Sequence, residues 1–132
     1  MVAALALALA VAPAMVVVDE RTVVKQEAPP HGSIGMSTAY RISDAVPNRT
    51  MEFRKRTLHV GAAIGEHVIA HDEVYYGLSG EGEVSSDGKR ARLTPGMAAY
   101  LYSGAKVGIR QSGKRPLVLI ITYPIPTGAP VR

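Results

Sequence analysis

Short apolar segments and turn-forming residues alternate along this chain from Ile34 to Tyr123. The apolar segments are three to seven residues long, and pairs such as Asp87-Gly88 and Pro95-Gly96 separate them. No segment in this region keeps a 3.6-residue apolar period over three turns. The pattern therefore predicts an all-β domain built as a barrel or a sandwich. The expected strand segments are residues 37–42, 51–53, 57–63, 67–70, 74–78, 82–85, 91–93, 98–102, 106–111 and 117–123.

The N-terminus has a different pattern, because residues 2–12 form an unbroken apolar run that ends in Ala12-Pro13-Ala14. Small residues at the first and third of these positions are typical of a signal-peptidase site, so residues 1–14 are predicted to be a signal peptide. A transmembrane helix needs about 20 apolar residues, and the charges that start at Asp19 come too early for one. The expected location is therefore periplasmic or secreted, without membrane association after leader cleavage. A buried terminal helix is the alternative.

The rest of the chain divides into three parts. Residues 15–32 are expected to form an N-terminal strand and linker, since the Pro29-Pro30 and Gly32 positions cannot sustain a helix or a central strand. Residues 33–126 form the predicted β domain, and residues 127–132 form a C-terminal tail. At 132 residues in total the chain has room for one such domain, so any activity must lie within it.

Composition narrows the chemistry further. The chain has no cysteine, which excludes disulfides, zinc–thiolate sites and thiol catalysis. Its formal net charge is +4, but the basic clusters have no aromatic residues interleaved and no nucleic-acid-binding motif beside them. Nucleic acid is therefore not an expected partner, and an anionic small molecule fits the charge better.

One segment carries a specific spacing of glycine, histidine and glutamate. Gly61 is followed by His67 after five residues, Ile69 comes two positions later, Glu73 follows after three more residues, and Gly80 after six. This spacing resembles the first motif of the cupin superfamily, in which a second histidine stands at the position of Ile69. The Leu-Ser-Gly-Glu-Gly run around Gly80 is also similar to the cupin segment that follows this glutamate.

A second motif of the same family is matched more loosely, fifteen residues after Gly80. Gly96 and Gly104 keep its glycine positions, whereas Tyr102 replaces a proline, Val107 a histidine and Gln111 an asparagine. The resemblance covers residues 34–124. It implies a single cupin-type jelly-roll β-barrel.

In cupins the two histidines and the glutamate of motif one, with the histidine of motif two, bind a divalent metal. The matching positions here are His67, Ile69, Glu73 and Val107, which leaves two of the four ligands. Two ligands rarely hold a catalytic metal. His71 could complete a set of His67, His71 and Glu73 if the chain bends between them, a set that suits non-heme iron. The expected cofactor is therefore none, or one divalent ion of Fe, Mn, Zn, Cu or Ni.

Two classes of function remain open. The first is binding of a small molecule, a sugar or an organic acid, in a pocket made more apolar by Ile69 and Val107 and bordered by Gln111 and Arg110. The second is a cupin enzyme of the isomerase, epimerase, lyase or dioxygenase type. It would work either through a divalent metal held by His67, His71 and Glu73, or without a metal, with His67 and Glu73 transferring protons and Tyr75 as a third participant.

Alternative explanations of these residues and of the N-terminal region also stay open. Glu73 can instead be a buried carboxylate paired with Arg110 or Lys55, and His67 a hydrogen-bonded core histidine. His31 and His59 lie outside any ligand-like spacing. The β-branched residues of segment 16–24 could add to a neighbour's sheet edge, so a homodimer is expected.

Overall fold

The computed structural model describes residue 3 and residues 13–126. The predicted C-terminal tail, and all of the predicted signal peptide except residues 3, 13 and 14, lie outside these residues. The strands are β1 (Val24–Glu27), β2 (Ser37–Tyr40), β3 (Met51–Leu58), β4 (Ala63–Val68), β5 (Glu73–Ser79), β6 (Glu81–Ser86), β7 (Lys89–Leu93), β8 (Ala98–Leu101), β9 (Lys106–Ser112) and β10 (Leu117–Pro124). Two short 3-10 helices, η1 (Glu20–Thr22) and η2 (Ile42–Ala45), complete the list.

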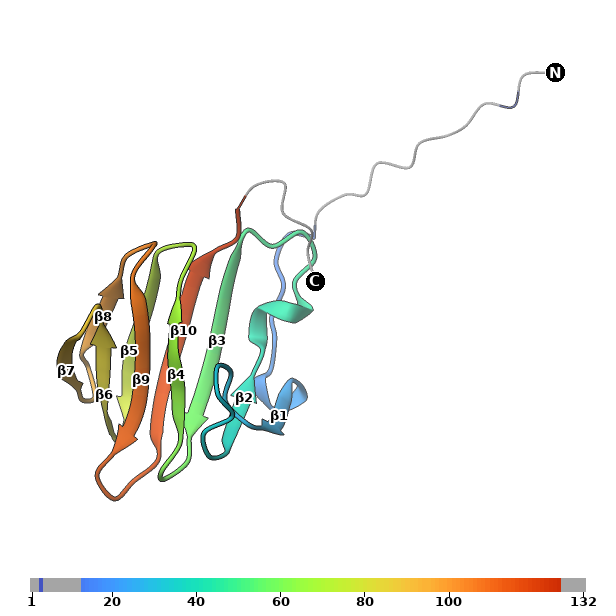
Figure 1. The fold of residues 1–132 in the computed structure, drawn as a ribbon. Coiled ribbons are helices and arrows are strands. Elements are labelled where there is room, and N and C mark those ends of the chain that lie inside the picture. Colours follow the sequence, from blue (N-terminus) through green and yellow to red (C-terminus); the bar gives the residue numbers. More distant parts are fainter. Residues whose placement is uncertain (1–2, 4–12, 127–132) are drawn as a thin grey trace.

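The strands form two antiparallel sheets that face each other (Figure 1). One sheet has six strands in the order β1-β2-β3-β10-β5-β8, and the other has four in the order β4-β9-β6-β7. Within residues 13–126 there is no α-helix. The all-β prediction is thus confirmed, and the two facing sheets are consistent with the expected jelly roll. Residue 3 and residues 13–126 also contain no helix long and apolar enough to cross a membrane.

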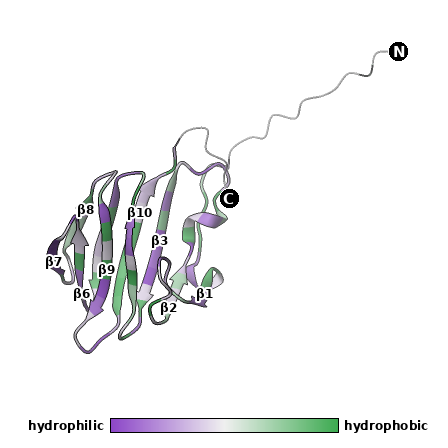
Figure 2. Cartoon of the chain, viewed as in Figure 1, coloured by the Kyte–Doolittle hydropathy of each residue, from purple (hydrophilic) through white to green (hydrophobic). Residues whose placement is uncertain are grey.

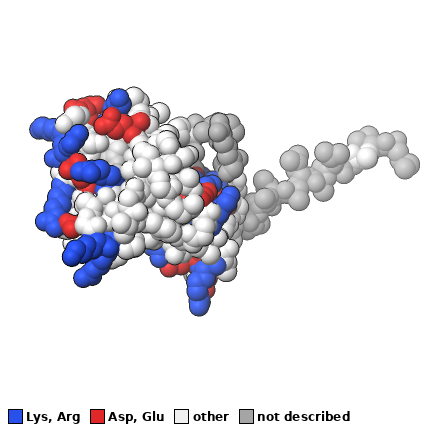
Figure 3. Space-filling view, turned by 60° about the horizontal axis from the view of Figure 1, so that its bottom comes forward, with Lys and Arg blue, Asp and Glu red and all other residues white. Residues whose placement is uncertain are grey.

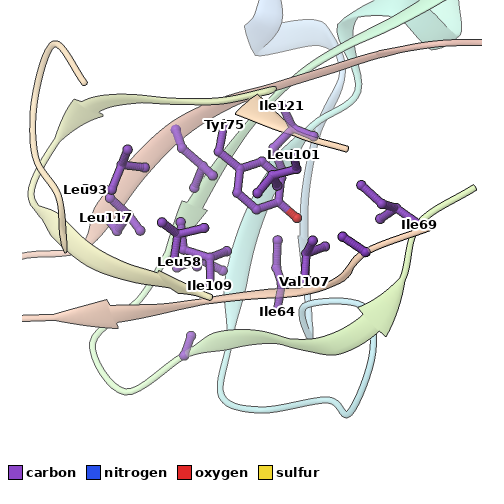
Figure 4. Close-up of a cluster of buried hydrophobic side chains, with 14 residues drawn as sticks. Leu58, Ile64, Ile69, Tyr75, Leu93, Leu101, Val107, Ile109, Leu117 and Ile121 are labelled. Atoms are coloured by element: carbon purple, nitrogen blue, oxygen red, sulfur yellow. The ribbon is translucent and has the colours of Figure 1, made fainter. Parts of the chain in front are cut away.

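The core lies between the sheets because every second residue of each strand points inward. In β10, for example, Leu117, Leu119 and Ile121 are buried, while the residues between them are partly exposed. Figure 2 shows this alternation as changes of hydropathy along the strands. Burial of each such side chain stabilises the fold by about 1.5–3 kcal/mol, so this cluster fixes how the sheets pack. Figure 4 shows it gathered between the strands.

Two details differ from the sequence prediction. Strand β3 runs unbroken through the charged residues 54–56, which were expected to separate two segments. It does so because Arg54 and Arg56 point to the inner face and find polar surroundings there, whereas Lys55 points outward. The turn expected at Gly65 instead occurs at residues 59–62, where the Ala62 amide donates to the His59 carbonyl, and Gly65 lies within β4.

Candidate functional site

A pocket of about 370 Å³ opens where β5 begins and β10 ends. Inward-facing residues of β3, β4, β5 and β10 form its walls, together with the segment between β4 and β5 and two residues of the N-terminal linker. The lining residues are Pro30, His31, Arg54, Arg56, Ile64, His67, Val68, Ile69, Ala70, His71, Glu73, Tyr75, Ile121 and Tyr123. The structure therefore brings His67, Ile69, His71, Glu73 and Tyr75 to one pocket.

Glu73 is the most unusual group in this pocket. Its side chain comes from the first residue of β5 and is only 6% exposed, and its Oε2 atom is buried without a hydrogen-bond partner. Burial raises the pKa of this carboxyl to about 7, and the nearby charge of Arg54 opposes that rise only in part. Near neutral pH the group can therefore both hold and release a proton.

Two arginines of β3 line the same pocket. The Arg54 Nε atom is buried without a hydrogen-bond partner, while its Nη2 atom lies 3.4 Å from both the Asp44 and the Glu52 carboxylates. Arg56 donates from Nη1 to the Ser37 hydroxyl at 2.8 Å. Two residues that line the pocket therefore each have a buried polar atom without a hydrogen-bond partner: the donor Nε of Arg54 and the Oε2 atom of Glu73.

Neither of the two partners considered for Glu73 in the sequence analysis contacts it. Lys55 points outward and pairs with Glu20 at 2.6 Å, and Arg110 pairs with Glu83 at 3.2 Å on the other sheet. Alternation along β3 and β9 is the reason, because Lys55 and Arg110 occupy outward-facing positions.

His67 is held in a defined orientation. Its Nδ1 atom lies 2.8 Å from the Gly65 carbonyl oxygen, and because that oxygen can only accept, Nδ1 carries the proton in the neutral ring. The other ring nitrogen, Nε2, then has the free lone pair. The ring stacks on that of His31, with centroids 3.6 Å apart and planes 6° from parallel.

His31 is a pocket residue that sequence reasoning missed. It lies in the linker 36 positions before His67, and no motif spacing connects the two. The backbone at His31, Gly32 and Ser33 has positive φ angles of 62°, 117° and 52°, which folds the linker back against β4. The His31 ring and carbonyl both contact β4, so the linker forms one wall of the pocket.

The close approach of this linker depends on Gly65. A Cβ atom at this position would lie 1.9 Å from the His31 carbonyl oxygen, much closer than such atoms can approach. Gly65→Ala is therefore expected to push the linker away, break the histidine stack and lower the free energy of unfolding by about 1–3 kcal/mol. Urea denaturation followed by circular dichroism measures this change.

Gly108→Ala is the matched control for that substitution. It places a methyl group on the neighbouring strand β9, where the nearest atoms, Glu66 Cγ and the Ile64 carbonyl oxygen, are both 3.2 Å away. Its expected loss is below about 1 kcal/mol. Equal losses in the two variants would show that the His31 contact contributes nothing of its own.

His71 lies at the pocket edge with its ring stacked on Tyr123, at a centroid distance of 4.2 Å. Burial lowers the pKa of His71, and the neighbouring His67 lowers it further. The His67 and His71 rings thus each stack on a different residue. Among the side chains that the structure describes, no three His, Asp or Glu groups are arranged to hold a metal ion. The predicted set of His67, His71 and Glu73 therefore does not fit a metal centre, although all three line one pocket.

Ile69 and Val107 occupy the two positions at which the resembling family has metal-binding histidines. Ile69 lines the pocket and is 3% exposed, and Val107, which pairs with His67 across β4 and β9, is fully buried (Figure 4). Both belong to the apolar core cluster. Tyr75 lies in the same cluster, and burial strongly raises the pKa of its hydroxyl, so this group stays protonated and cannot act as a base at neutral pH.

Three residues predicted to bind or border the ligand do not line this pocket: Val107, Arg110 and Gln111. Val107 is instead buried in the apolar core cluster. Arg110 is on the outer face of β9. Gln111 points inward but lies toward the opposite end of the sheets, where it accepts from the Gly61 amide at 2.9 Å and donates to three carbonyls of the β9–β10 turn. Gln111 is thus a structural residue of the turn.

Comparison with known proteins gives a family match. A family model described as "Cupin domain" matches residues 55–123. No match to a curated protein was found.

Solved structures with the same fold include three of different origin. The crystal structure of a predicted oxalate decarboxylase from Thermotoga maritima has a TM-score of 0.74 and 23% identity, covering 84% of this chain and 100% of that one. KdgF from a Halomonas species has a TM-score of 0.58 and 21% identity, with 69% and 81% covered. The Cnp3 cupin domain of Schizosaccharomyces pombe has a TM-score of 0.62 and 15% identity, with 69% and 66% covered. At these identities the likeness concerns the fold alone.

Proposed function

This chain belongs to the cupin domain family, and from that premise we propose that its pocket around Glu73 and Arg54 binds a small organic acid. Cupins include proteins of unrelated activities, so the proposal rests on the chemistry of this pocket. One solved structure with this fold, from Thermotoga maritima, is described as that of a predicted oxalate decarboxylase, and oxalate is a small organic acid.

One observation carries the proposal. Two buried polar atoms without hydrogen-bond partners, Glu73 Oε2 and Arg54 Nε, belong to residues that line the same pocket. Leaving a buried polar group unpaired costs about 1–3 kcal/mol, and more if it is charged, so such groups indicate a ligand that pairs with them. A carboxylate suits both: one of its oxygens accepts from Arg54 Nε, and the other accepts from Glu73 when that group is protonated.

The remaining walls favour a ligand with an apolar part. Ile64, Ile69, Ala70 and Ile121 supply hydrocarbon, and the rings of His31 and Tyr123 supply flat surfaces. A few polar groups on a mostly apolar lining are typical of small-molecule sites. The volume of about 370 Å³ is at the lower end of such sites and suits a compact acid.

Calorimetric titration with a panel of monocarboxylates, dicarboxylates, sugar acids and neutral sugars tests this proposal. We expect at least one acid to bind, and Arg54→Met to weaken it by about 10- to 100-fold, the effect of losing a charged hydrogen bond. Arg21→Met, at an exposed position outside the pocket, is the matched control and is expected to leave affinity unchanged. Absence of binding by every acid, or equal binding to both variants, would contradict the proposal.

A second candidate function is metal-free proton transfer on such an acid, as in an isomerase or epimerase. It is favoured by the Glu73 pKa of about 7, because a general base or acid is most effective when it titrates near the working pH. His67 lines the same pocket and supports this function, since its Nε2 atom is free to accept a proton.

A further inference from the structure

A second hollow, of about 620 Å³, lies at the opposite end of the sheets from the Glu73 pocket. Glu73 begins β5 and Gly80 follows its last residue, so an extended strand separates the two sites by about 20 Å. The turns β5–β6 and β9–β10 and the end of β7 line this hollow. Its charged residues are Glu81, Arg92, Lys114 and Arg115.

The excess of positive charge lies in the second half of the described chain, which contributes all the residues that line this hollow. Between residues 76 and 126 there are seven Lys and Arg but three Asp and Glu, whereas residues 13–75 have seven and eight. Figure 3 shows the resulting gathering of Lys and Arg on the side where β6, β7 and β9 lie. Arg92 pairs with Glu81, but in the described part of the chain Lys114 and Arg115 have no carboxylate partner.

The turn that carries Lys114 and Arg115 is held by hydrogen bonds from a buried side chain. The amide of Gln111, a residue only 7% exposed, donates to the carbonyls of Ser112, Gly113 and Arg115 at 2.9–3.0 Å. These cations are therefore attached to a backbone whose geometry is set by a buried side chain. Because this backbone is already ordered, binding of an anion between the two side chains costs little backbone conformational entropy.

The cationic surface continues along the outer face of β6. Glu81 and Glu83 lie two residues apart on that face, about 7 Å along the strand. Glu83 is flanked by Arg90 at 3.8 Å and Arg110 at 3.2 Å, at the side of a shallow hollow of about 460 Å³ over Gly108. This surface is thus an elongated track along β6, in which arginine side chains alternate with the carboxylates of Glu81 and Glu83. The arginines are the more numerous of the two.

We propose that this track, defined by Arg90, Arg92, Arg110, Lys114 and Arg115, binds an acidic polysaccharide. Arginine and lysine pair with the acidic groups of such a chain, and Glu81 and Glu83 accept hydrogen bonds from its hydroxyls. Nucleic acid fits less well, because its dense phosphates would be repelled by these carboxylates. The lining of the two hollows also contains no aromatic side chain on which bases could stack. This site is separate from the Glu73 pocket and does not depend on its proposed function.

Titration of the full chain with polygalacturonate, at low and at physiological salt, tests the proposal. We expect binding that weakens with salt, and a loss of about tenfold in affinity for the double variant Lys114→Gln/Arg115→Gln at low salt. Arg21→Gln/Lys25→Gln, on the exposed N-terminal edge, removes the same charge and is expected to change affinity less than twofold. Circular dichroism confirms that both variants are folded.

Three results would overturn the proposal. One is the absence of binding to polygalacturonate at low salt. Another is an equal loss in both double variants, which would assign binding to net charge alone. The third is a lack of preference for polygalacturonate, seen either as tighter binding to double-stranded DNA or as equally tight binding to uncharged dextran.

Discussion

Replacing Glu73 by Gln is expected to leave the free energy of unfolding nearly unchanged at pH 4.5 and to raise it by about 3 kcal/mol at pH 8. The carboxyl of Glu73 has a pKa of about 7 in the folded protein, against 4.5 as its ordinary value. The folded state therefore binds the proton more tightly than the unfolded state. Urea denaturation of both proteins at pH 4.5, 6, 7 and 8 measures the difference.

The sign follows from the direction of the pKa shift. Below the unfolded pKa the group is protonated in both states, so it causes no loss of stability. As pH rises toward 7, the unfolded chain releases the proton more readily, and the wild-type protein loses stability until the folded state releases it too. Gln stays neutral throughout and avoids this loss.

Glu66→Gln is the control, because this carboxylate lies exposed on β4 and the substitution makes the same chemical change. Its effect is expected to stay within about 0.5 kcal/mol at every pH. A flat pH dependence for Glu73→Gln would mean that the Glu73 carboxyl is hydrated or paired and ionises normally.

The second large effect concerns proton transfer. If Glu73 is the base, the protein should catalyse deuterium uptake from D2O at the carbon next to the carboxylate of an acid that it binds, and Glu73→Gln should slow this at least 100-fold. Gln keeps a hydrogen-bond donor toward the ligand, so affinity should change much less than rate. Proton NMR of the bound acid follows the exchange.

The pH dependence of this exchange gives an independent check. The carboxylate form is the base, so the rate should rise as pH passes through about 7. Glu66→Gln should keep the wild-type rate. Exchange that survives in Glu73→Gln would rule out Glu73 as the base, while leaving the proposal of small-molecule binding intact.

The fold was predictable from the sequence because its signals are local. Turn residues such as Asp87-Gly88 and Pro95-Gly96 occur between the same strands in the structure as in the prediction. Strand β3 was the exception, since three successive charges normally indicate a turn. Only the three-dimensional structure shows that Arg56 reaches Ser37 and Glu27 from the inner face, which lets the strand continue.

The site was predictable only where residues share a motif. His67, Ile69 and Glu73 were placed in one pocket by their spacing along the chain. His31 and Arg54 could not be found in this way, because they reach the pocket from separate segments, through folding of the linker and from the inner face of β3. Val107, Arg110 and Gln111 were wrongly expected there, since the loose second motif does not indicate which face or which end of β9 borders the pocket.

The length of β5 determines how the molecule would be oriented when its basic track is bound to a polysaccharide. The strand begins at the Glu73 pocket and ends beside the second hollow at Gly80, so the two sites lie at opposite ends of the molecule. A molecule bound through its basic track would have its Glu73 pocket facing the surrounding solution. Solutes could then diffuse in and out of an immobilised protein without crossing the layer that holds it.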